Sequence, residues 1–304
     1  MAKFTNILLI GATGSIGSLI LSTFQKDAIF NLTILQRASS KSRLPSNLKV
    51  ITVADTFPLE DLTAAFKGQD VVINCMTVLS VSAQFRIVDA AIAARVRRFV
   101  PSEYGLNNAR PEAQALNAVF ANKGKLQAYL REQAAVGRIE WMSISNGMWL
   151  KWAIAHEFLG VHVSERRFMR WDDGLGLFSC TTEENTAAAL LQALKIPEET
   201  RNRNIFLSDF AITQTQLLES LERVQGLKYE VQTIDSQKLI EEKQEAFRLG
   251  DEDAAFPLIE TGFVTGRYGG HLEMEGTIMN KKLGLPKREL DEVVEEGLRA
   301  VGAL

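Results

Sequence analysis

Three glycines stand at short spacing after the first apolar run of the chain, in the string Gly11-Ala12-Thr13-Gly14-Ser15-Ile16-Gly17. A strand before such a loop and a helix after it bring free backbone amides and the positive end of a helix dipole to one point. Gly11 would permit a tight turn, Gly14 would let the backbone approach a pyrophosphate, and Gly17 would allow close packing of helix on strand. Glycines alone also fit an ordinary turn, but this setting predicts a dinucleotide site contacted by Gly11, Thr13, Gly14, Ser15, Ile16 and Gly17.

The residues after the strand expected over 32–36 indicate which dinucleotide binds. An acidic side chain there would hold the ribose 2′-hydroxyl of NAD, and this chain has none at that point. Arg37, Ser39 and Lys41 stand there instead, and their guanidinium, hydroxyl and ammonium groups suit an additional phosphate. The pattern favours NADP(H); a solvated basic loop is the alternative interpretation.

Further polar groups follow later expected strands, and ligands of doubly wound sheets bind at the carboxyl ends of the strands. The residues expected to line the cofactor there are Asn74, Cys75 and Met76, then Pro101, Ser102 and Glu103, and finally Asn146. Core packing remains an alternative for the first three. Glu103 could equally accept hydrogen bonds from backbone amides.

A tyrosine four residues before a lysine, the acid–base pair of typical short-chain dehydrogenases, does not occur in this sequence. Lys123 lies on a helix expected after the strand at 98–101, so it can project toward the carboxyl ends of the strands. An ammonium group near a desolvated pocket and a nicotinamide ring can have its pKa lowered toward working pH, as acid–base service requires. Lys123 is the candidate general acid or base, with a solvated surface lysine, as expected for Lys125, as the alternative. The Tyr104 hydroxyl is a candidate second proton donor.

The elements that must position these groups follow from hydrophobic spacing. Short apolar runs predict strands at residues 6–10, 32–36, 49–53, 71–75, 98–101 and 139–144, and apolar residues three and four apart predict helices at 16–24, 59–66, 84–94 and 116–132. This alternation predicts an α/β fold with a doubly wound parallel Rossmann sheet.

The rhythm changes after about residue 150. Helices are expected at 183–194, 214–225, 235–249 and 287–301, a strand at 204–207, and a glycine-rich connection at 261–276. We therefore expect an NADP-binding Rossmann domain over residues 1–150, with a return contribution from about 180–210. Residues 151–304 are expected to form a second, smaller α+β substrate-binding lobe.

Composition excludes several classes of protein. Of the 304 residues, 46% are hydrophobic and 23% charged, as in folded water-soluble chains, and a net charge of −3 gives no basic field for nucleic acid. No apolar run approaches the ~18 residues that cross a bilayer, so no membrane partner is expected. Neither the two cysteines nor His156 and His162 have metal-ligand spacing, so no metal is expected. We expect a cytoplasmic monomer or homodimer.

Three stretches carry a resemblance to a known family. The glycine loop, the turn Pro101-Ser102-Glu103-Tyr104-Gly105 and the string Phe120-Ala121-Asn122-Lys123 together resemble the isoflavone reductase and phenylcoumaran benzylic ether reductase group and the related NmrA-like proteins. This group is an atypical branch of the short-chain dehydrogenases, and residues 143–152 and 173–182 resemble its fungal NmrA-like subgroup. Tyr104 replaces the more usual phenylalanine, and the last part of the chain matches only loosely.

The resemblance implies that Lys123 is the general acid or base. It also implies an NADPH-dependent reductase of specialised metabolism, which passes hydride to a carbonyl, imine or conjugated alkene of a bulky aromatic, polyketide or alkaloid substrate. Its substrate cleft would be lined by Met148, Trp149, Trp152, Phe263, Tyr268 and His271. Core packing is the alternative for each of the apolar and aromatic residues, and a solvated loop histidine is the alternative for His271. Two alternatives stay open: an NmrA-like NADP-binding redox sensor that regulates transcription without catalysis, and an NADP-bound cyclase or isomerase without net redox change.

Overall fold

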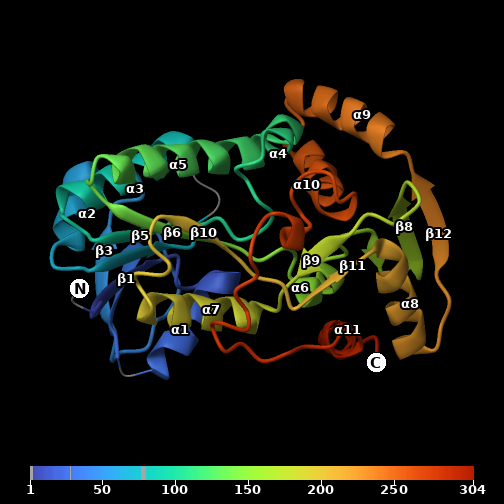
Figure 1. Cartoon of the computed structure of the whole chain (residues 1–304), viewed down its shortest axis with the longest axis horizontal. Helices are drawn as coiled ribbons and strands as arrows, with labels where there is room; N and C mark the ends of the chain where they lie inside the picture. Colours follow the sequence, from blue (N-terminus) through green and yellow to red (C-terminus); the bar gives the residue numbers. More distant parts are fainter. Residues whose placement is uncertain (1–2, 28, 77–79) are drawn as a thin grey trace. The chain divides into compact units, whose positions relative to one another are not determined.

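The computed structural model describes residues 3–27, 29–76 and 80–304. The chain divides into two compact units. The sheet unit comprises Met1–Glu103, Lys125–Ile144 and Ala187–Ile205, and the second unit comprises Tyr104–Gly124, Ser145–Thr186 and Phe206–Leu304. Figure 1 follows the chain through both.

The sheet unit is built on a seven-stranded sheet whose strands have the order β10-β6-β5-β4-β1-β2-β3. The strands are β1 (Asn6–Ile10), β2 (Asn31–Arg37), β3 (Lys49–Val53), β4 (Val71–Asn74), β5 (Arg98–Val100), β6 (Glu140–Ser145) and β10 (Arg203–Phe206). All pairs from β3 to β6 are parallel. Every residue of β4 and β5 is buried, as expected for strands covered on both faces.

Helices cover both faces of this sheet: α1 (Ser15–Gln25), α2 (Leu59–Phe66), α3 (Val81–Ala93), α5 (Ala118–Ala135) and α7 (Glu183–Lys195). Figure 1 shows α1 and α7 on one face and α2, α3 and α5 on the other. On α1 the buried residues Ile16, Ile20 and Phe24 recur every fourth position, so one stripe of the helix packs inward. The predicted α/β doubly wound parallel sheet is confirmed.

The second unit has an α+β composition. It contains α4 (Pro111–Leu116), α6 (Leu150–Ala155), β7 (Val161–His162), β8 (Arg167–Trp171), β9 (Phe178–Cys180), β11 (Phe210–Ile212), α8 (Gln214–Gln225), β12 (Glu230–Ile234), α9 (Ser236–Arg248), α10 (Ala255–Val264) and α11 (Leu290–Ala300). Strand β11 pairs with β9, and β8 lies between β12 and β7. This unit has more residues than the sheet unit, because residues 104–124 group with it. The sequence instead predicts that the second lobe is the smaller one.

Local signals in the second unit explain one success and one failure of prediction. Helix α8 begins with a capping box between Thr213 and Gln216 and ends at Gly226 with φ +66°, so its bounds were predictable. The glycine-rich stretch predicted as a connection instead begins inside α10. There Gly262 serves close packing, since a Cβ on it would lie 2.9 Å from the Phe120 ring.

A buried arginine ties three segments of the sheet unit together. The Arg98 side chain at the start of β5 donates to Glu140 at the start of β6 (2.7 Å), to the carbonyl of Pro197 (2.7 Å) and to the Thr200 hydroxyl (2.9 Å). Burial lowers the pKa of Arg98, although the Glu140 carboxylate acts in the opposite sense. Removing the Glu140 carboxylate would leave the charged Arg98 guanidinium buried without access to water.

We therefore expect Glu140→Ala to reduce the free energy of unfolding by about 3–5 kcal/mol, because it strands the buried Arg98 guanidinium. Arg98→Met should cost less, since the Glu140 side chain is 21% exposed and can be solvated. Urea denaturation measures both. Glu245→Ala, in an exposed pair with Arg248, is the control and should change stability little. Equal losses in all three variants would contradict this account.

Candidate functional site

A pocket of about 250 Å³ lies in the sheet unit where β1, β2 and β4 end. Strand β1 lies between β4 and β2, and ligands of such sheets bind at the point where the strand order reverses. The pocket is lined by Ile10, Gly11, Ala12, Thr13, Gly14, Ile34, Leu35, Gln36, Arg37, Ser40, Leu44, Cys75 and Met76. None of these lining residues is acidic.

The glycine loop has the backbone geometry that phosphate binding requires. Gly11 has φ +79°, a conformation that favours glycine, and the Gly14 amide donates to its carbonyl (3.1 Å). A Cβ on Gly17 would collide with the Gly11 carbonyl, so only glycine lets α1 start this close to the turn. The N-cap residue of α1 is Gly14, which has no capping side chain, and the first amides of the helix suit an anion. The chain's residues therefore fit a dinucleotide phosphate.

Of the residues predicted to hold an additional phosphate, the structure places only Arg37 on the pocket wall. The Ser39 hydroxyl donates to the Asp55 carboxylate (2.7 Å), and Lys41 is exposed and is not among the lining residues. Ser40 lines the pocket in their place. The sequence contained no signal that could distinguish Ser40 from its neighbour, because both are serines of one loop.

Asn74 holds the turn that follows β4. It is fully buried, its side-chain nitrogen donates to Gln84 on α3 (2.7 Å), and its side-chain oxygen accepts from the Met76 amide (3.0 Å). Gln84 donates in turn to the Met76 carbonyl (2.9 Å). Asn74 therefore positions Cys75 and Met76, which line the pocket.

The other predicted cofactor residues of the sheet unit do not line this pocket. Ser15 is exposed on the first turn of α1, while Ile16 and Gly17 are buried in its packing face. Pro101, Ser102 and Glu103 are buried after β5, where Glu103 accepts a hydrogen bond from the Gln127 side chain (3.0 Å).

Lys123 and Tyr104 belong to the second unit. Lys123 is half-buried on α5, whereas Lys125, two residues later, is exposed. Helix α5 packs closely against the backbone at Asn108, because a Cβ on Gly124 would lie 2.7 Å from the Asn108 carbonyl oxygen. The Tyr104 ring lies 6.1 Å, centroid to centroid, from that of Trp149.

Backbone hydrogen bonds join four segments of the second unit, at residues 105–107, 147–148, 179 and 269–270, into one surface that we call the wall of the second unit. They link residues 105 and 147 (3.0 Å), 107 and 269 (2.9 Å), 148 and 179 (2.9 Å), and 179 and 270 (2.9 Å). The wall brings together Tyr104, Asn146, Met148, Trp149 and His271 from the predicted set. Asn146 is buried, and its side-chain oxygen has no hydrogen-bond partner among the residues the structure describes.

The remaining predicted substrate residues pack as core. Phe263 on α10 is 4% exposed within the hydrophobic cluster of the second unit. Trp152 stacks on His156 and packs edge-on against Phe158, and Tyr268 packs against the same cluster. The core interpretation, which the sequence left open for each aromatic residue, describes these three.

Two comparisons identify the family. Residues 3–137 match the NmrA-like family. The chain is 34% identical over 300 residues to the oxidoreductase aprR of Aspergillus flavus, covering 96% of this chain and 98% of that relative. The chain belongs to the NmrA-like, isoflavone reductase-like family. It is an oxidoreductase of that family, as its residue motifs predicted.

Solved structures share the fold of this chain. The crystal structure of isoflavone reductase aligns with a TM-score of 0.77 at 18% identity, over 97% of this chain and 99% of that one. AtPrR2 with NADP⁺ and (+)pinoresinol aligns with a TM-score of 0.74 at 16% identity, with the same coverage. The NADP⁺ in that neighbour agrees with the cofactor class predicted here from the glycine loop and Arg37.

Within the described ranges 3–27, 29–76 and 80–304 of this NmrA-like chain, no helix is long and apolar enough to cross a membrane. The same residues contain no group of three or more His, Cys, Asp or Glu side chains placed to hold a metal ion.

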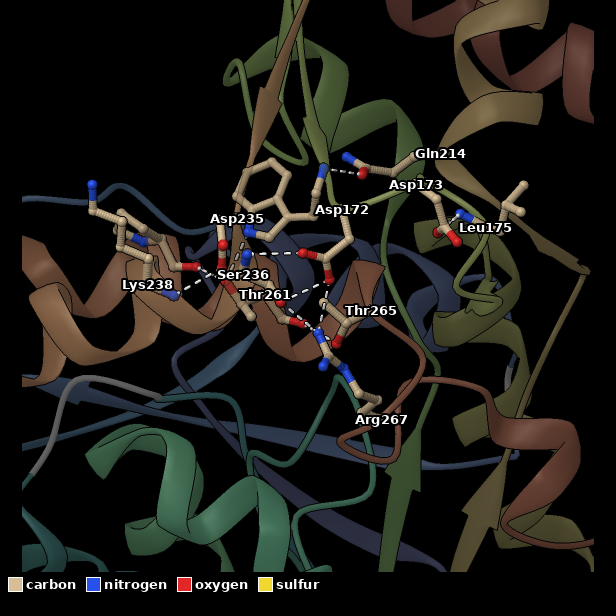
Figure 2. A network of polar contacts seen from close by, with 12 residues as sticks. Asp172, Asp173, Leu175, Gln214, Asp235, Ser236, Lys238, Thr261, Thr265 and Arg267 are labelled. Atoms are coloured by element: carbon tan, nitrogen blue, oxygen red, sulfur yellow. Dashed lines mark hydrogen bonds and ion pairs between the residues drawn. The ribbon is translucent and has the colours of Figure 1, made fainter.

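Figure 2 shows a polar network around Asp172 that includes Arg267, the residue before Tyr268 in the sequence. The Asp172 carboxylate, after β8, accepts from the Ser236 amide (2.9 Å), the Ser236 hydroxyl (2.7 Å) and the Arg267 guanidinium (2.9 Å). Burial raises the pKa of Asp172, but these donors together outweigh it and lower the pKa. Trp171 extends the network by donating from its indole to Thr261 on α10 (2.8 Å). The residue before Tyr268 is thus fixed to the end of β8.

The close approach at Gly17 gives a sharp stability test. Gly17→Ala places a methyl group against the Gly11 carbonyl, and we expect it to lower the free energy of unfolding by about 1–3 kcal/mol. Gly14→Ala is the matched control, because its Cβ would stand 3.5 Å from the same oxygen and its φ is −77°. Thermal and urea denaturation of both variants measure these changes in the free energy of unfolding. A Gly17→Ala protein as stable as Gly14→Ala would refute the steric account.

Glu260 on α10 makes the stability of the second unit pH-dependent. Burial raises the pKa of its carboxyl from 4.5 to about 7, although the Gly160 amide donates to it (3.3 Å). The folded state holds this proton more tightly than the unfolded chain, so its contribution is complete below pH 4.5 and is lost as pH rises to about 7. Glu260→Gln should therefore gain stability relative to the parent protein between pH 5 and pH 8. A difference between the two proteins that stays constant across this range would exclude Glu260 as the cause.

Proposed function

We propose that this chain is an NADPH-dependent reductase that passes hydride to a carbonyl, imine or conjugated alkene of a bulky aromatic, polyketide or alkaloid compound of specialised metabolism. One observation carries the proposal: the pocket at the ends of β1, β2 and β4 combines the glycine turn with Arg37 and has no carboxylate on its wall. A wall without a carboxylate neither binds a free 2′-hydroxyl as NAD enzymes do nor repels a 2′-phosphate.

The chain's own groups divide the binding of NADP(H) between them. The amides at the start of α1, from Gly14 onward, hold the pyrophosphate, and the helix dipole favours its charge. The Arg37 guanidinium and the Ser40 hydroxyl bind the 2′-phosphate. When bound, the cofactor supplies the hydride.

Lys123 provides the proton that the reduction requires. It donates to the substrate atom on which negative charge develops when hydride is accepted, or stabilises that charge electrostatically. Its partial burial on α5 supports this role, because an ammonium group with less water around it interacts more strongly with a nearby anion. Tyr104, which also belongs to the second unit, carries a hydroxyl and is proposed as a second donor.

The wall in the second unit supports a substrate that is large, planar and weakly charged. The ring pair of Tyr104 and Trp149 supplies aromatic surface, and His271, whose Nε2 lies 3.6 Å from the Glu273 carboxylate, supplies a polar group. Met148 lies in the hydrophobic cluster of this unit, and Asn146 is buried. Such a combination of apolar area with few polar groups is typical of small-molecule sites. Trp152, Phe263 and Tyr268 support this wall from the core.

The test compares Lys123→Ala with Lys125→Ala, a neighbouring lysine on the same helix. With a panel of phenolic, polyketide and alkaloid ketones, imines and enones, oxidation of NADPH should fall about 10²- to 10⁴-fold in Lys123→Ala, as loss of a general acid predicts. Lys125→Ala should match the parent protein, and both variants should retain NADPH binding in calorimetry.

Other outcomes assign other functions. Unchanged turnover in Lys123→Ala would remove this lysine from the mechanism. NADPH binding without turnover of any compound would favour the redox sensor. NADPH carrying deuterium at the transferred position separates a reductase, which labels its product, from a cyclase or isomerase, which does not.

A further inference from the structure

The loop after β2 is tied to the end of the neighbouring strand β3. Arg37 and Val53 face each other in the register of these strands, and the Ala38 amide donates to the Val53 carbonyl (2.8 Å). One residue further, the Ser39 hydroxyl donates to the carboxylate of Asp55 (2.7 Å). Two successive loop residues are therefore held by the segment that leaves β3.

The same loop is also closed on itself. The Ser40 amide donates to the Arg37 carbonyl (3.0 Å), and the Gln36 side chain donates to the Ser42 carbonyl (3.0 Å). These bonds form a tight turn in which Arg37 and Ser40 line the pocket while Ser39 faces Asp55. The turn thus places two successive serines in different surroundings.

The arginine of this turn is available to a ligand. Across the residues that the structure describes, the Arg37 side chain forms no hydrogen bond and no ion pair. Asp55 follows the end of the adjacent strand β3 and accepts its hydrogen bond from the neutral Ser39 hydroxyl. An arginine that lines a pocket without a protein carboxylate suits a phosphate oxygen, because such bonds are charge-assisted.

We propose that Asp55 is a positioning residue that sets the preference for NADPH over NADH. Its carboxylate holds the Ser39 hydroxyl, and this bond keeps the turn in the form that presents Arg37 and Ser40 to the 2′-phosphate. The inference rests on the proposed function, since it takes the pocket as the site of NADPH. In NAD enzymes the acidic residue follows the second strand and binds the ribose directly. Here Asp55 follows β3 and supports the phosphate site indirectly, by holding the loop after β2.

The experiment measures the Kd of NADPH and of NADH by calorimetry for the parent protein, three single variants and one double variant. Asp55→Ala removes the acceptor, and we expect its Kd for NADPH to rise about 3- to 10-fold, the range of one hydrogen bond, with NADH unchanged. Asp55→Asn keeps an oxygen that accepts from Ser39 and should restore NADPH binding to within about 2-fold of the parent. Ser39→Ala should reproduce Asp55→Ala, and combining the two should add no further loss.

Three results would overturn the inference. An equal loss of NADPH and NADH in Asp55→Ala would place Asp55 against a part of the dinucleotide that both share. Unchanged NADPH binding in Asp55→Ala, or additive losses in the double variant, would show that the Ser39 bond does not position the turn. Failure of the parent protein to bind either coenzyme is a different result, because it would end the proposed function together with this inference.

Discussion

The cofactor pocket depends on a steric constraint between two backbones. Helix α1 begins so close to the turn after β1 that residue 17 has no space for a side chain beside the Gly11 carbonyl. This contact aims the first amides of α1 at the carboxyl end of β1, and the parallel neighbours β2 and β4 supply the two side walls. A phosphate-binding end is therefore a consequence of how tightly strand and helix pack, and the side chains of the walls only refine which nucleotide fits.

Buried polar groups in the sheet unit mostly position other residues. Asn74 and Gln84 hold the turn that presents Cys75 and Met76, and Gln127 donates to the buried Glu103. Arg98 similarly joins β5 to β6 and to the connection before β10. A buried polar side chain is costly unless it is bonded, so each one fixes the geometry of its partners. From a sequence alone, such a residue at a strand end has the same signature as a residue that touches the ligand.

The sequence predicted the sheet well because its strands are consecutive apolar runs between helices with apolar residues three and four apart. The second unit was less predictable for identifiable reasons. Strands such as β7 and β9 have only two or three residues, too few to show a period. Gly262 imitates a loop residue but serves packing inside α10. Phe263 and Trp152 look like ligand-binding aromatics but pack in or against the core, and aromatic identity alone does not distinguish these roles.

The charges around the pocket follow from where the acidic residue stands. At the end of β2 a carboxylate would face the ribose directly, whereas here the position holds Arg37, and the carboxylate of Asp55 stands beyond β3. The Asp55 carboxylate accepts its hydrogen bond from the neutral Ser39 hydroxyl. Within the described part of the chain it therefore forms no ion pair with Arg37, and the guanidinium charge stays available to a ligand. Ser40, one residue further, then shares the wall with the guanidinium. The two adjacent serines therefore have different roles: Ser39 donates a hydrogen bond to Asp55, and Ser40 lines the pocket.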